Sequence, residues 1–470
     1  MNLPQTFIER TRQLLGDETY SKFEEALRTD SPVSIRLNRM KSTQSVEGES
    51  VPWASSGTYL KNRPTFTFDP LFHAGCYYVQ EASSMFVERV LQEYVKEPVV
   101  MLDLCAAPGG KSTLCRGILP QGSLLVANEV MRNRSQILAE NLIKWGHPEV
   151  VVTNNAPADF TELTNLFDVI LTDVPCSGEG MFRKDSVAIE EWSLENVDIC
   201  WKRQRCILED IWPALKPGGM LIYSTCTFNR EEDEDNVEWI AQELGAEILS
   251  VPVEEAWGIT GNLTGKDFPV YRFLPHLTKG EGFFLAVLKK RDDVSDETPR
   301  RFLKTSSRLD KKKKGKDAKQ LVVPKEAKAW LKDSSDYSLI MKENHVVAFP
   351  KAYDNEYELF QQTLKVIHAG ITLGEIKGKD LIPHHSLAMS TALASDIFPK
   401  AEVTYEQAIS YLRKEGMILD ADVPRGYVLL IYKDAPLGFV KNMGNRANNL
   451  YPQEWRIRSG YLPEEVVCVF

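Results

Sequence analysis

The chain has 470 residues, 43% of them hydrophobic and 26% charged, a composition typical of globular proteins and long enough for two to four domains. The sequence has no run of about 18 apolar residues and its N-terminus carries early charges, so we expect no membrane span, no secretory signal and a cytoplasmic protein. The formal net charge of −10 argues against nonspecific coating of nucleic acid, although it allows a local basic face, and the eight cysteines form no CxxC pair that would indicate zinc or a disulfide framework.

The N-terminal segment predicts one helix followed by one short strand. Up to about residue 28, apolar residues recur at roughly helical spacing, which predicts an amphipathic helix. Residues 31–41 alternate as a strand whose polar members include Arg36, Arg39 and Lys41. These cations could meet phosphates, but a solvated strand face is the simpler expectation. Residues 64–91 then place aromatic side chains around Gly75 and follow a helical pattern from about Glu81.

The rest of the chain is organised around residues 99–113, which read VVMLDLCAAPGGKST. An apolar run ends at Asp103, a turn follows, and a helix-compatible segment begins near Lys111, so we predict a buried strand, a tight turn and a helix N-terminus. Gly109 and Gly110 allow the backbone to approach a ligand closely, and free N–H groups at the helix start offer donors. Such a turn suits a nucleotide-like ligand.

Strands and helices alternate from residue 99 to residue 290. Further strands are expected at 124–128, 150–154, 167–173, 220–225 and 282–290, and helices at 132–145, 196–215 and 236–244. This alternation predicts an α/β fold, a doubly wound parallel sheet with helices on both faces. Ligands of such sheets bind outside the carboxyl ends of the strands, where the sequence places Asp103, Glu129, Asn154, Asp173 and Cys226.

The pattern breaks after residue 290. Residues 291–325 are acidic at first and then strongly basic, with four consecutive lysines at 311–314, and they predict a flexible basic linker. Its role could be a tether for nucleic-acid phosphates or a solvated hinge. From about residue 326 we expect a second, smaller unit with strands near 338–342, 345–349, 427–433 and 437–442 and a helix near 404–415. Its segment 437–452 offers Lys441, Arg446 and several asparagines beside Tyr451.

Two cysteines stand out by their settings. Cys176 lies in the glycine-bounded stretch DVPCSGEG after the fourth strand, and Cys226 lies in STCTFNREEDED after the fifth. Adjacent strands of one sheet could bring both loops over one ligand. A thiol has a pKa of about 8.5, and a positive neighbour lowers it toward a reactive thiolate. The acidic run at 231–235 fits the first turn of the next helix, so we expect its role to be structural.

Four motifs, in this order and spacing, resemble those of a known family: DLCAAPGGKS, NEVMRNRS, DVPCSGEGMFRKD and STCTFNREEDE. Over about residues 30–290 the chain is similar to the RNA cytosine-5 methyltransferases of the RsmB/NOP2/NSUN type. The stretch HAGCYYVQEASSM, the basic gap and the ending LGFVKNMGNRANNLYP look most like the bacterial RsmF subfamily, which modifies small-subunit ribosomal RNA. The resemblance implies a Rossmann-like S-adenosylmethionine-dependent methyltransferase sheet, an N-terminal α+β extension and a C-terminal PUA-like α+β domain that binds RNA.

The resemblance also implies a reaction, the transfer of a methyl group from S-adenosylmethionine to C5 of a cytosine in RNA, for which we expect 16S ribosomal RNA. In this family the TC-motif thiol, here Cys226, adds to C6 of the base, and the PC-motif thiol, here Cys176, assists product release. Asp173 is expected beside the cofactor and the base, and Glu129 is expected to accept from both ribose hydroxyls. The loop expected around the methionine part of the cofactor comprises Cys105, Ala106, Ala107, Pro108, Gly109, Gly110 and Lys111.

One position departs from the family. Many members have an aspartate after the third strand, near the adenine, where this sequence has Ala156. Asn154 or Asn155 could substitute with a side-chain amide.

Three alternatives to this reading stay open. The substrate could be transfer RNA, the chain could be a catalytically idle RNA-binding factor of ribosome assembly, or it could be a DNA cytosine methyltransferase, against which the TC motif argues. We expect ribosomal RNA or the small ribosomal subunit as the partner, with no membrane and no metal. The expected divisions are an RNA-binding extension (1–95), a catalytic domain (96–290), the linker (291–325) and a PUA-like RNA-binding domain (326–470).

Overall fold

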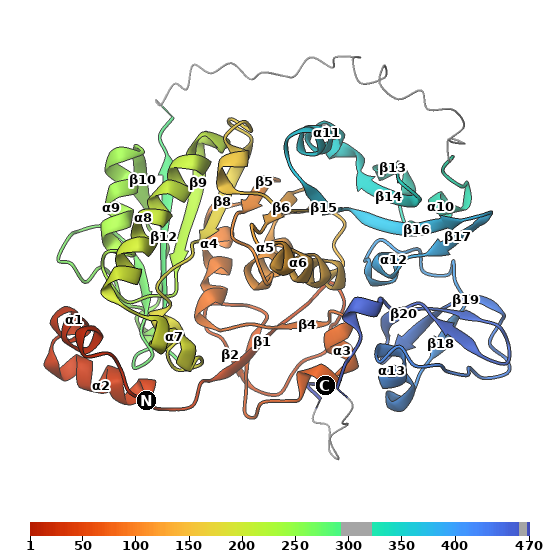
Figure 1. The fold of residues 1–470 in the computed structure, drawn as a ribbon, viewed down its shortest axis with the longest axis horizontal. Coiled ribbons are helices and arrows are strands. Elements are labelled where there is room, and N and C mark those ends of the chain that lie inside the picture. Colours follow the sequence, from red (N-terminus) through yellow and green to blue (C-terminus); the bar gives the residue numbers. More distant parts are fainter. Residues whose placement is uncertain (293–321, 460–467) are drawn as a thin grey trace.

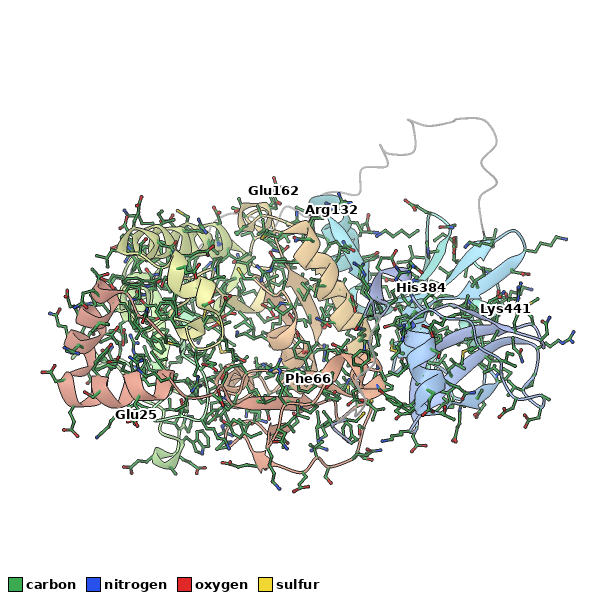
Figure 2. The ribbon with its side chains drawn as sticks, turned by 60° about the horizontal axis from the view of Figure 1, so that its bottom comes forward. Glu25, Phe66, Arg132, Glu162, His384 and Lys441 are labelled. Carbon is green, nitrogen blue, oxygen red and sulfur yellow. The ribbon has the colours of Figure 1, made fainter. Side chains whose placement is uncertain are left out.

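The computed structural model describes residues 1–292, 322–459 and 468–470, so the predicted basic linker lies almost wholly outside the described residues. The N-terminal helices and the C-terminal strands lie at opposite ends of the molecule, with a large sheet between them (Figure 1). Glu25 and Lys441 mark these two ends (Figure 2). Among the described residues, none of the helices has the length and apolar character that a membrane crossing requires.

A mixed sheet of nine strands forms the centre of the molecule. Five neighbouring strands are parallel, in the order β9, β8, β5, β6 and β7. Three antiparallel strands extend the β9 side. The bounds along the chain are β5 (Val100–Asp103), β6 (Leu124–Asn128), β7 (Val150–Thr153), β8 (Phe167–Asp173), β9 (Leu215–Thr225), β10 (Ala246–Leu249), β11 (Tyr271–Phe273) and β12 (Phe283–Lys290). The expected strands are all present, although β9 begins at Leu215 rather than at residue 220.

Helices cover both faces of this sheet, which confirms the predicted doubly wound α/β fold. On β5, Met101 packs against one helical layer and Leu102 against the other, because successive side chains of a strand point to opposite faces. Because helices cover both faces of the sheet, both sets of strand side chains are buried, and the strand sequences are continuous apolar runs. One layer holds α4 (Val87–Tyr94), α5 (Gly110–Ile118) and α6 (Arg132–Trp145), and the other holds α8 (Leu194–Ile211), α9 (Glu234–Glu243) and α11 (Asp354–Thr363).

The ends of these helices follow local rules. Helix α6 has the predicted bounds and ends at Gly146, whose φ of 89° is the left-handed conformation that glycine adopts without strain. Helix α8 stops at Ile211, before the predicted residue 215, and a short 3-10 turn, Trp212–Ala214, continues the chain. Pro213 within that turn has no N–H to continue the α-helical hydrogen bonds.

The N-terminal segment differs from the prediction of one helix. It forms α1 (Gln5–Leu15) and α2 (Asp17–Leu27), which are separated by Gly16 at a φ of 81°. Helical spacing continues through both helices, so the periodicity alone concealed the bend. A four-stranded sheet in the order β2, β3, β1, β4 follows, with β1 (Val33–Leu37), β2 (Glu49–Ser50), β3 (Gly57–Leu60) and β4 (Tyr77–Val79), and the short helix α3 (Pro70–His73) precedes β4.

Arg36 of β1 is buried, so the expected solvated strand face is wrong at this position. Its guanidinium donates to Gln80 Oε1 at 2.9 Å and to Thr113 Oγ1 at 2.6 Å, and it stacks over the ring of Trp145. Lys41 likewise donates to backbone carbonyl oxygens. Both cations therefore join the N-terminal sheet to helices of the central sheet, and of the three predicted cations only Arg39 is exposed.

The chain after residue 325 contributes to the central sheet, which the sequence did not indicate. Strand β15 (Val366–Ala369) pairs antiparallel with β7 and forms the edge of the sheet. Helix α11 packs on the same face as α8. A strand of four residues, VIHA, is too short to be recognised from alternation.

The remainder of the C-terminal part forms two four-stranded sheets. The first has the order β13, β14, β16, β17 and the second has the order β18, β19, β20, β21. Tyr411 and Tyr451 from this part share one hydrophobic core with Leu37 and Tyr77 of the N-terminal sheet. The bounds are α10 (Glu326–Ala329), β13 (Tyr337–Lys342), β14 (His345–Pro350), β16 (Ile371–Lys377), β17 (Asp380–Pro383), α12 (His385–Met389), β18 (Lys400–Glu402), α13 (Tyr405–Leu412), β19 (Gly426–Tyr432), β20 (Ala435–Asn442) and β21 (Ala447–Asn449).

The burial of Arg36 leads to a stability prediction. Arg36→Met keeps the side-chain length but leaves the acceptors on Gln80 and Thr113 unpaired, so we expect a loss of about 2–3 kcal/mol in the free energy of unfolding. Arg39→Met is the matched control at an exposed site and should change this free energy by no more than about 0.5 kcal/mol. Urea titration followed by circular dichroism measures both, and equal effects of the two substitutions would contradict the structural role of Arg36.

Candidate active site

The parallel strands bring the expected polar residues together at the carboxyl ends of the strands. Asp103 at the end of β5 pairs in register with Leu171 of β8, and Asp173, two residues further along β8, pairs with Ser224 of β9. Cys176 and Cys226 follow β8 and β9 within three residues, and Glu129 and Asn154 directly follow β6 and β7. Each residue expected at a strand end therefore lies there.

The loop from Cys105 to Lys111 makes a tight turn between β5 and α5. Gly109 has a φ of 114°, which side chains rarely tolerate, and the helix begins at Gly110. Arg134 donates to the carbonyl oxygen of Ala107 at 2.9 Å, and Asn141 donates to that of Pro108 at 2.8 Å. These contacts from α6 fix the loop while the first N–H groups of α5 lack partners within the helix.

Buried polar atoms beside this loop have unused hydrogen-bonding capacity. Asp103 Oδ2 accepts from Ser112 Oγ at 2.6 Å, but Asp103 Oδ1 has no partner among the described residues although it is buried. Burial raises the pKa of Asp103 to about 7. An unpaired buried oxygen is costly unless a ligand or a water satisfies it. A polar ligand such as the amino-acid part of a cofactor fits this position.

Glu129 is held at the end of β6 with its carboxylate directed by the backbone. Its Oε1 accepts from the N–H of Met131 at 2.9 Å, and Arg134 lies 3.4 Å from Oε2. The side chain of Glu129 is only 4% exposed. A carboxylate fixed in this way has free lone pairs and suits a pair of ribose hydroxyls.

Lys111 and Asp173 form an ion pair above the sheet. Lys111 Nζ lies 2.8 Å from Asp173 Oδ2, and Ser224 donates to Asp173 Oδ1 at 2.8 Å. Burial by itself would lower the pKa of Lys111, but Asp173 and the other nearby anions raise it overall. The lysine therefore stays protonated and holds the Asp173 carboxylate in place.

The two cysteines meet although 50 residues separate them in the chain. The sulfur atoms of Cys176 and Cys226 lie 3.0 Å apart, both cysteines are free thiols, and the N–H of Cys226 points to the Cys176 sulfur at 3.4 Å. The hydrogen bond to Cys226 is the largest cause that raises the pKa of Cys176 well above its usual range, and burial is the second. The protonated thiol of Cys176 is therefore favoured, and either sulfur can donate the hydrogen bond that joins the pair. Local sequence patterns allowed both loops over one ligand, and the geometry brings their sulfur atoms into direct contact.

The acidic run at 231–235 differs from the prediction that it forms the first turn of a helix. Helix α9 starts at Glu234, while Glu232 and Asp233 precede it and are fully buried. Asp233 Oδ1 accepts from Thr225 Oγ1 at 2.6 Å, and Asp233 Oδ2 forms an ion pair with Arg272 Nη1 at 3.1 Å. Glu232 contacts the loop that carries Cys176. These two acids thus support the residues around the cysteines, which the sequence did not indicate because it does not show which loop faces them.

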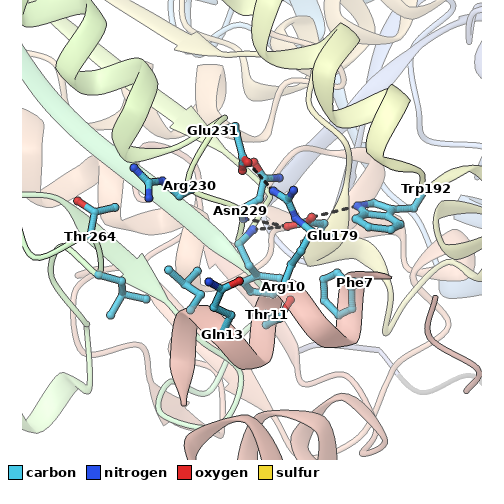
Figure 3. Close-up of a pocket in the computed structure, with 13 residues that line it drawn as sticks. Phe7, Arg10, Thr11, Gln13, Glu179, Trp192, Asn229, Arg230, Glu231 and Thr264 are labelled. Atoms are coloured by element: carbon cyan, nitrogen blue, oxygen red, sulfur yellow. Dashed lines mark hydrogen bonds and ion pairs between the residues drawn. The ribbon is translucent and has the colours of Figure 1, made fainter. Parts of the chain in front are cut away.

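A cavity of about 370 Å³ lies beside the two cysteine-bearing loops. Its wall includes Glu179, three residues after Cys176, and Asn229, three residues after Cys226, and helix α1 closes it with Phe7 and Arg10 (Figure 3). Arg10 pairs with Glu231 at 2.6 Å across the cavity. The sequence did not indicate this cavity, because it exists only where α1 packs against the end of the sheet.

Around Ala156 the two candidate amides already have partners. Asn154 donates to the carbonyl oxygens of Glu129 and Val130, both at 2.8 Å, and Asn155 donates to Asp159. Lys365, just before β15, bonds to the amide oxygens of both asparagines. An adenine contact by either residue therefore stays a prediction.

Three family models match parts of the chain. They are described as 16S rRNA methyltransferase RsmB/F, over residues 90–289, N-terminal domain of 16S rRNA methyltransferase RsmF, over residues 3–82, and Methyltransferase RsmF PUA domain, over residues 398–457. The ribosomal RNA small subunit methyltransferase F of Shewanella oneidensis is 31% identical over 86% of this chain and 85% of its own. That of Aliivibrio fischeri is 30% identical over 98% of both chains.

Solved structures are similar to the central part of the chain. A methyltransferase homolog protein from Pyrococcus horikoshii is 29% identical, with a TM-score of 0.53, over 61% of this chain and 95% of its own. NSun6 from Pyrococcus horikoshii with SFG, an S-adenosylmethionine analogue, has a TM-score of 0.53 over 61% of this chain and 98% of its own, but at 21% identity it supports the fold alone. Together the matches confirm the predicted fold, a Rossmann-like S-adenosylmethionine-dependent methyltransferase with a C-terminal PUA domain, and the predicted cofactor.

The position of Glu129 predicts its effect on cofactor affinity. If Glu129 accepts from the ribose hydroxyls as expected, Glu129→Ala leaves those hydroxyls unpaired, and S-adenosylmethionine binding should weaken by about 1–3 kcal/mol in titration calorimetry. Glu162→Ala, which removes an exposed carboxylate outside the site, is the matched control and should bind as the wild type does (Figure 2). An unchanged affinity in a folded Glu129→Ala protein would remove Glu129 from the cofactor site.

Proposed function

Because this chain belongs to the ribosomal RNA small subunit methyltransferase F family, we propose that it transfers a methyl group from S-adenosylmethionine to C5 of a cytosine in 16S ribosomal RNA. The observation that carries the proposal is the pair of thiols, Cys176 and Cys226, with sulfur atoms 3.0 Å apart. Nitrogen and oxygen atoms of RNA can take a methyl group directly through a lone pair. C5 of cytosine lacks one and needs a nucleophile to activate the ring, which explains the thiols.

We assign the attack on the base to Cys226. Its sulfur forms a bond to C6, the electrons of the C5–C6 double bond move into the ring, and C5 becomes nucleophilic like the carbon of an enamine. A protonated Cys176 can donate a hydrogen bond to this sulfur, and Lys111 is close enough to interact with it electrostatically. Both groups stabilise negative charge on the attacking sulfur.

We assign product release to Cys176. Once C5 carries both a hydrogen and the new methyl group, the C5 proton must leave, and a solvent water molecule accepts it. The electrons of that C–H bond restore the double bond, the bond between C6 and sulfur breaks, and Cys226 recovers its electron pair. Cys176 lies next to the departing sulfur. The Asp173 carboxyl, oriented by Lys111 and Ser224, can hydrogen-bond the N3/N4 edge of the base during both steps.

The cofactor supplies the methyl group, bonded to a positively charged sulfur. In our proposal the loop made of Cys105, Ala106, Ala107, Pro108, Gly109, Gly110 and Lys111 holds its methionine part. The unpaired Asp103 Oδ1 and the oriented Glu129 carboxylate support this placement, since both offer acceptors to a polar ligand.

We further propose that RNA is bound by the parts that flank the catalytic domain. The proposed division is residues 1–95 as an RNA-binding extension, 96–290 as the catalytic domain, 291–325 as a linker and 326–470 as the PUA-containing part, in a protein that acts in the cytoplasm. Strand β15 is an exception to the last boundary, since it completes the catalytic sheet. Point substitutions therefore test the C-terminal part better than its removal, which would strip the edge of that sheet.

The two cysteine roles predict different outcomes of substitution. Cys226→Ala should abolish turnover and leave no covalent RNA adduct, because no thiol attacks C6. Cys176→Ala should still attack and transfer the methyl group but release product slowly. It should therefore accumulate a protein–RNA complex that survives denaturing electrophoresis.

The reverse pattern would assign the attack to Cys176, as in a DNA-type arrangement. Cys206→Ala is the matched control, because Cys206 is an exposed thiol on α8, and it should turn over normally without an adduct.

The substrate class is tested by methyl transfer from tritiated S-adenosylmethionine to ribosomal RNA, small ribosomal subunits, transfer RNA and DNA in parallel. We expect label in 16S ribosomal RNA, and bisulfite sequencing of that RNA should place it at a cytosine. Label confined to transfer RNA would identify transfer RNA as the substrate in place of ribosomal RNA. Label confined to DNA would overturn the proposal. Binding of RNA without any transfer would favour a catalytically idle assembly factor.

A further inference from the structure

Two buried carboxylates join the loops that carry the cysteines. We define the Cys176 loop as residues 174–182 and the Cys226 loop as residues 226–233. Glu179 of the Cys176 loop accepts from the N–H groups of Phe228 and Asn229, at 2.8 and 3.0 Å. Glu232 of the Cys226 loop accepts from the N–H of Ser177 at 3.0 Å. Each loop thus provides a carboxylate that binds the backbone of the other loop.

Both carboxylates are anchored from outside the loops. Glu179 Oε1 accepts from the indole N–H of Trp192 at 3.0 Å, a contact visible in Figure 3. Glu232 accepts from Gln204 of α8 at 2.7 Å, and the same amide donates to the carbonyl oxygen of Pro175 at 3.0 Å. The carboxylates therefore tie the loops to each other and to a helix of the sheet.

Burying these two carboxyl groups costs free energy, which indicates that their role is more than packing. Glu179 and Glu232 are 2% and 0% exposed, and their described contacts give neither one a direct ion pair with a cation. Burial raises the pKa of both, that of Glu232 to about 7. The charge of Glu179 also raises the pKa of Glu232, and the charge of Glu232 raises that of Cys176. Apolar residues would pack the same space without this penalty. They could not, however, accept the backbone N–H groups that lie next to the cysteines.

We propose that Glu179 and Glu232 are positioning residues that hold the sulfur atoms of Cys176 and Cys226 at the separation needed for release of the methylated base. The assignment of a release step rests on the proposed function, whereas the control of the sulfur separation does not. Ser177, whose N–H is bound by Glu232, directly follows Cys176, so this carboxylate controls the position of the releasing thiol. Glu179 controls the backbone two and three residues beyond Cys226.

The separation of the sulfur atoms can be measured without RNA. Phenylarsine oxide condenses with two neighbouring thiols, forming two As–S bonds and one water, and binds single thiols far more weakly. The wild type should bind one equivalent tightly, and Cys176→Ala should lose that binding. Glu232→Gln and Glu179→Gln keep the side-chain size but turn an amide toward the backbone donors, so each should weaken arsenical binding at least tenfold.

Asp235→Asn is the matched control, because Asp235 belongs to the same acidic run but its carboxylate pairs with the half-exposed Arg230 side chain rather than with backbone N–H groups beside the cysteines. It should bind the arsenical as the wild type does. Calorimetric binding of S-adenosylmethionine, which uses neither loop, checks that each variant is folded. Should Glu232→Gln fail this check, Glu179→Gln carries the test. Folded variants that bind the arsenical with wild-type affinity would overturn the proposal.

A second readout connects the carboxylates to release. Glu232→Gln should accumulate the covalent RNA complex, as expected of Cys176→Ala, with a lowered kcat and a KM for RNA close to that of the wild type. A role in stability alone would instead lower the amount of active protein without any adduct. If no variant or wild type forms an adduct, the covalent function fails, but the arsenical measurement still decides whether the carboxylates set the sulfur separation.

Discussion

The parallel pairing of β8 with β5 and β9 is the constraint on which the candidate site depends. Because the three strands run in the same direction and in register, Asp103, Asp173 and Ser224 lie together at the carboxyl ends of the strands. The sheet is covered by helices on both faces, so these strands cannot shift without exposing buried apolar residues such as Leu102 and Ile170. The rigid sheet therefore sets where each of the following loops begins.

The strands set where the loops start, and polar contacts between the loops then fix how far apart the loops lie. Two loops that follow neighbouring strands have no fixed separation unless side-chain contacts connect them. Here Glu179 and Glu232 supply those connections, and Arg272, buried at 1% exposure, neutralises the neighbouring Asp233 and Glu234. The three buried members of the acidic run, Glu232, Asp233 and Glu234, are thus compatible with a dry interior, because each has a cation or several N–H donors.

The C-terminal part is bound to the catalytic part more closely than a linker and a separate unit would suggest. Strand β15 extends the central sheet, and Lys365 bonds to Asn154 and Asn155 next to the expected cofactor site. The N-terminal sheet shares a hydrophobic core with the C-terminal tyrosines. These contacts connect the C-terminal part directly to the central sheet and, through a shared core, to the N-terminal sheet.

The sequence alone determined the central α/β pattern, because long apolar runs and strong helical periodicity are local signals. For the same reason it placed Asp103, Glu129, Asp173, Cys176 and Cys226 at the ends of strands or just after them. The family resemblance supplied the chemistry that is proposed for them. Only the tertiary structure decided which distant groups meet. The bend at Gly16, the burial of Arg36, the sheet-edge position of β15 and the partners of Glu179 and Glu232 all depend on contacts between residues far apart in the chain. Local spacing carries no information on such contacts, since the packing of whole elements creates them.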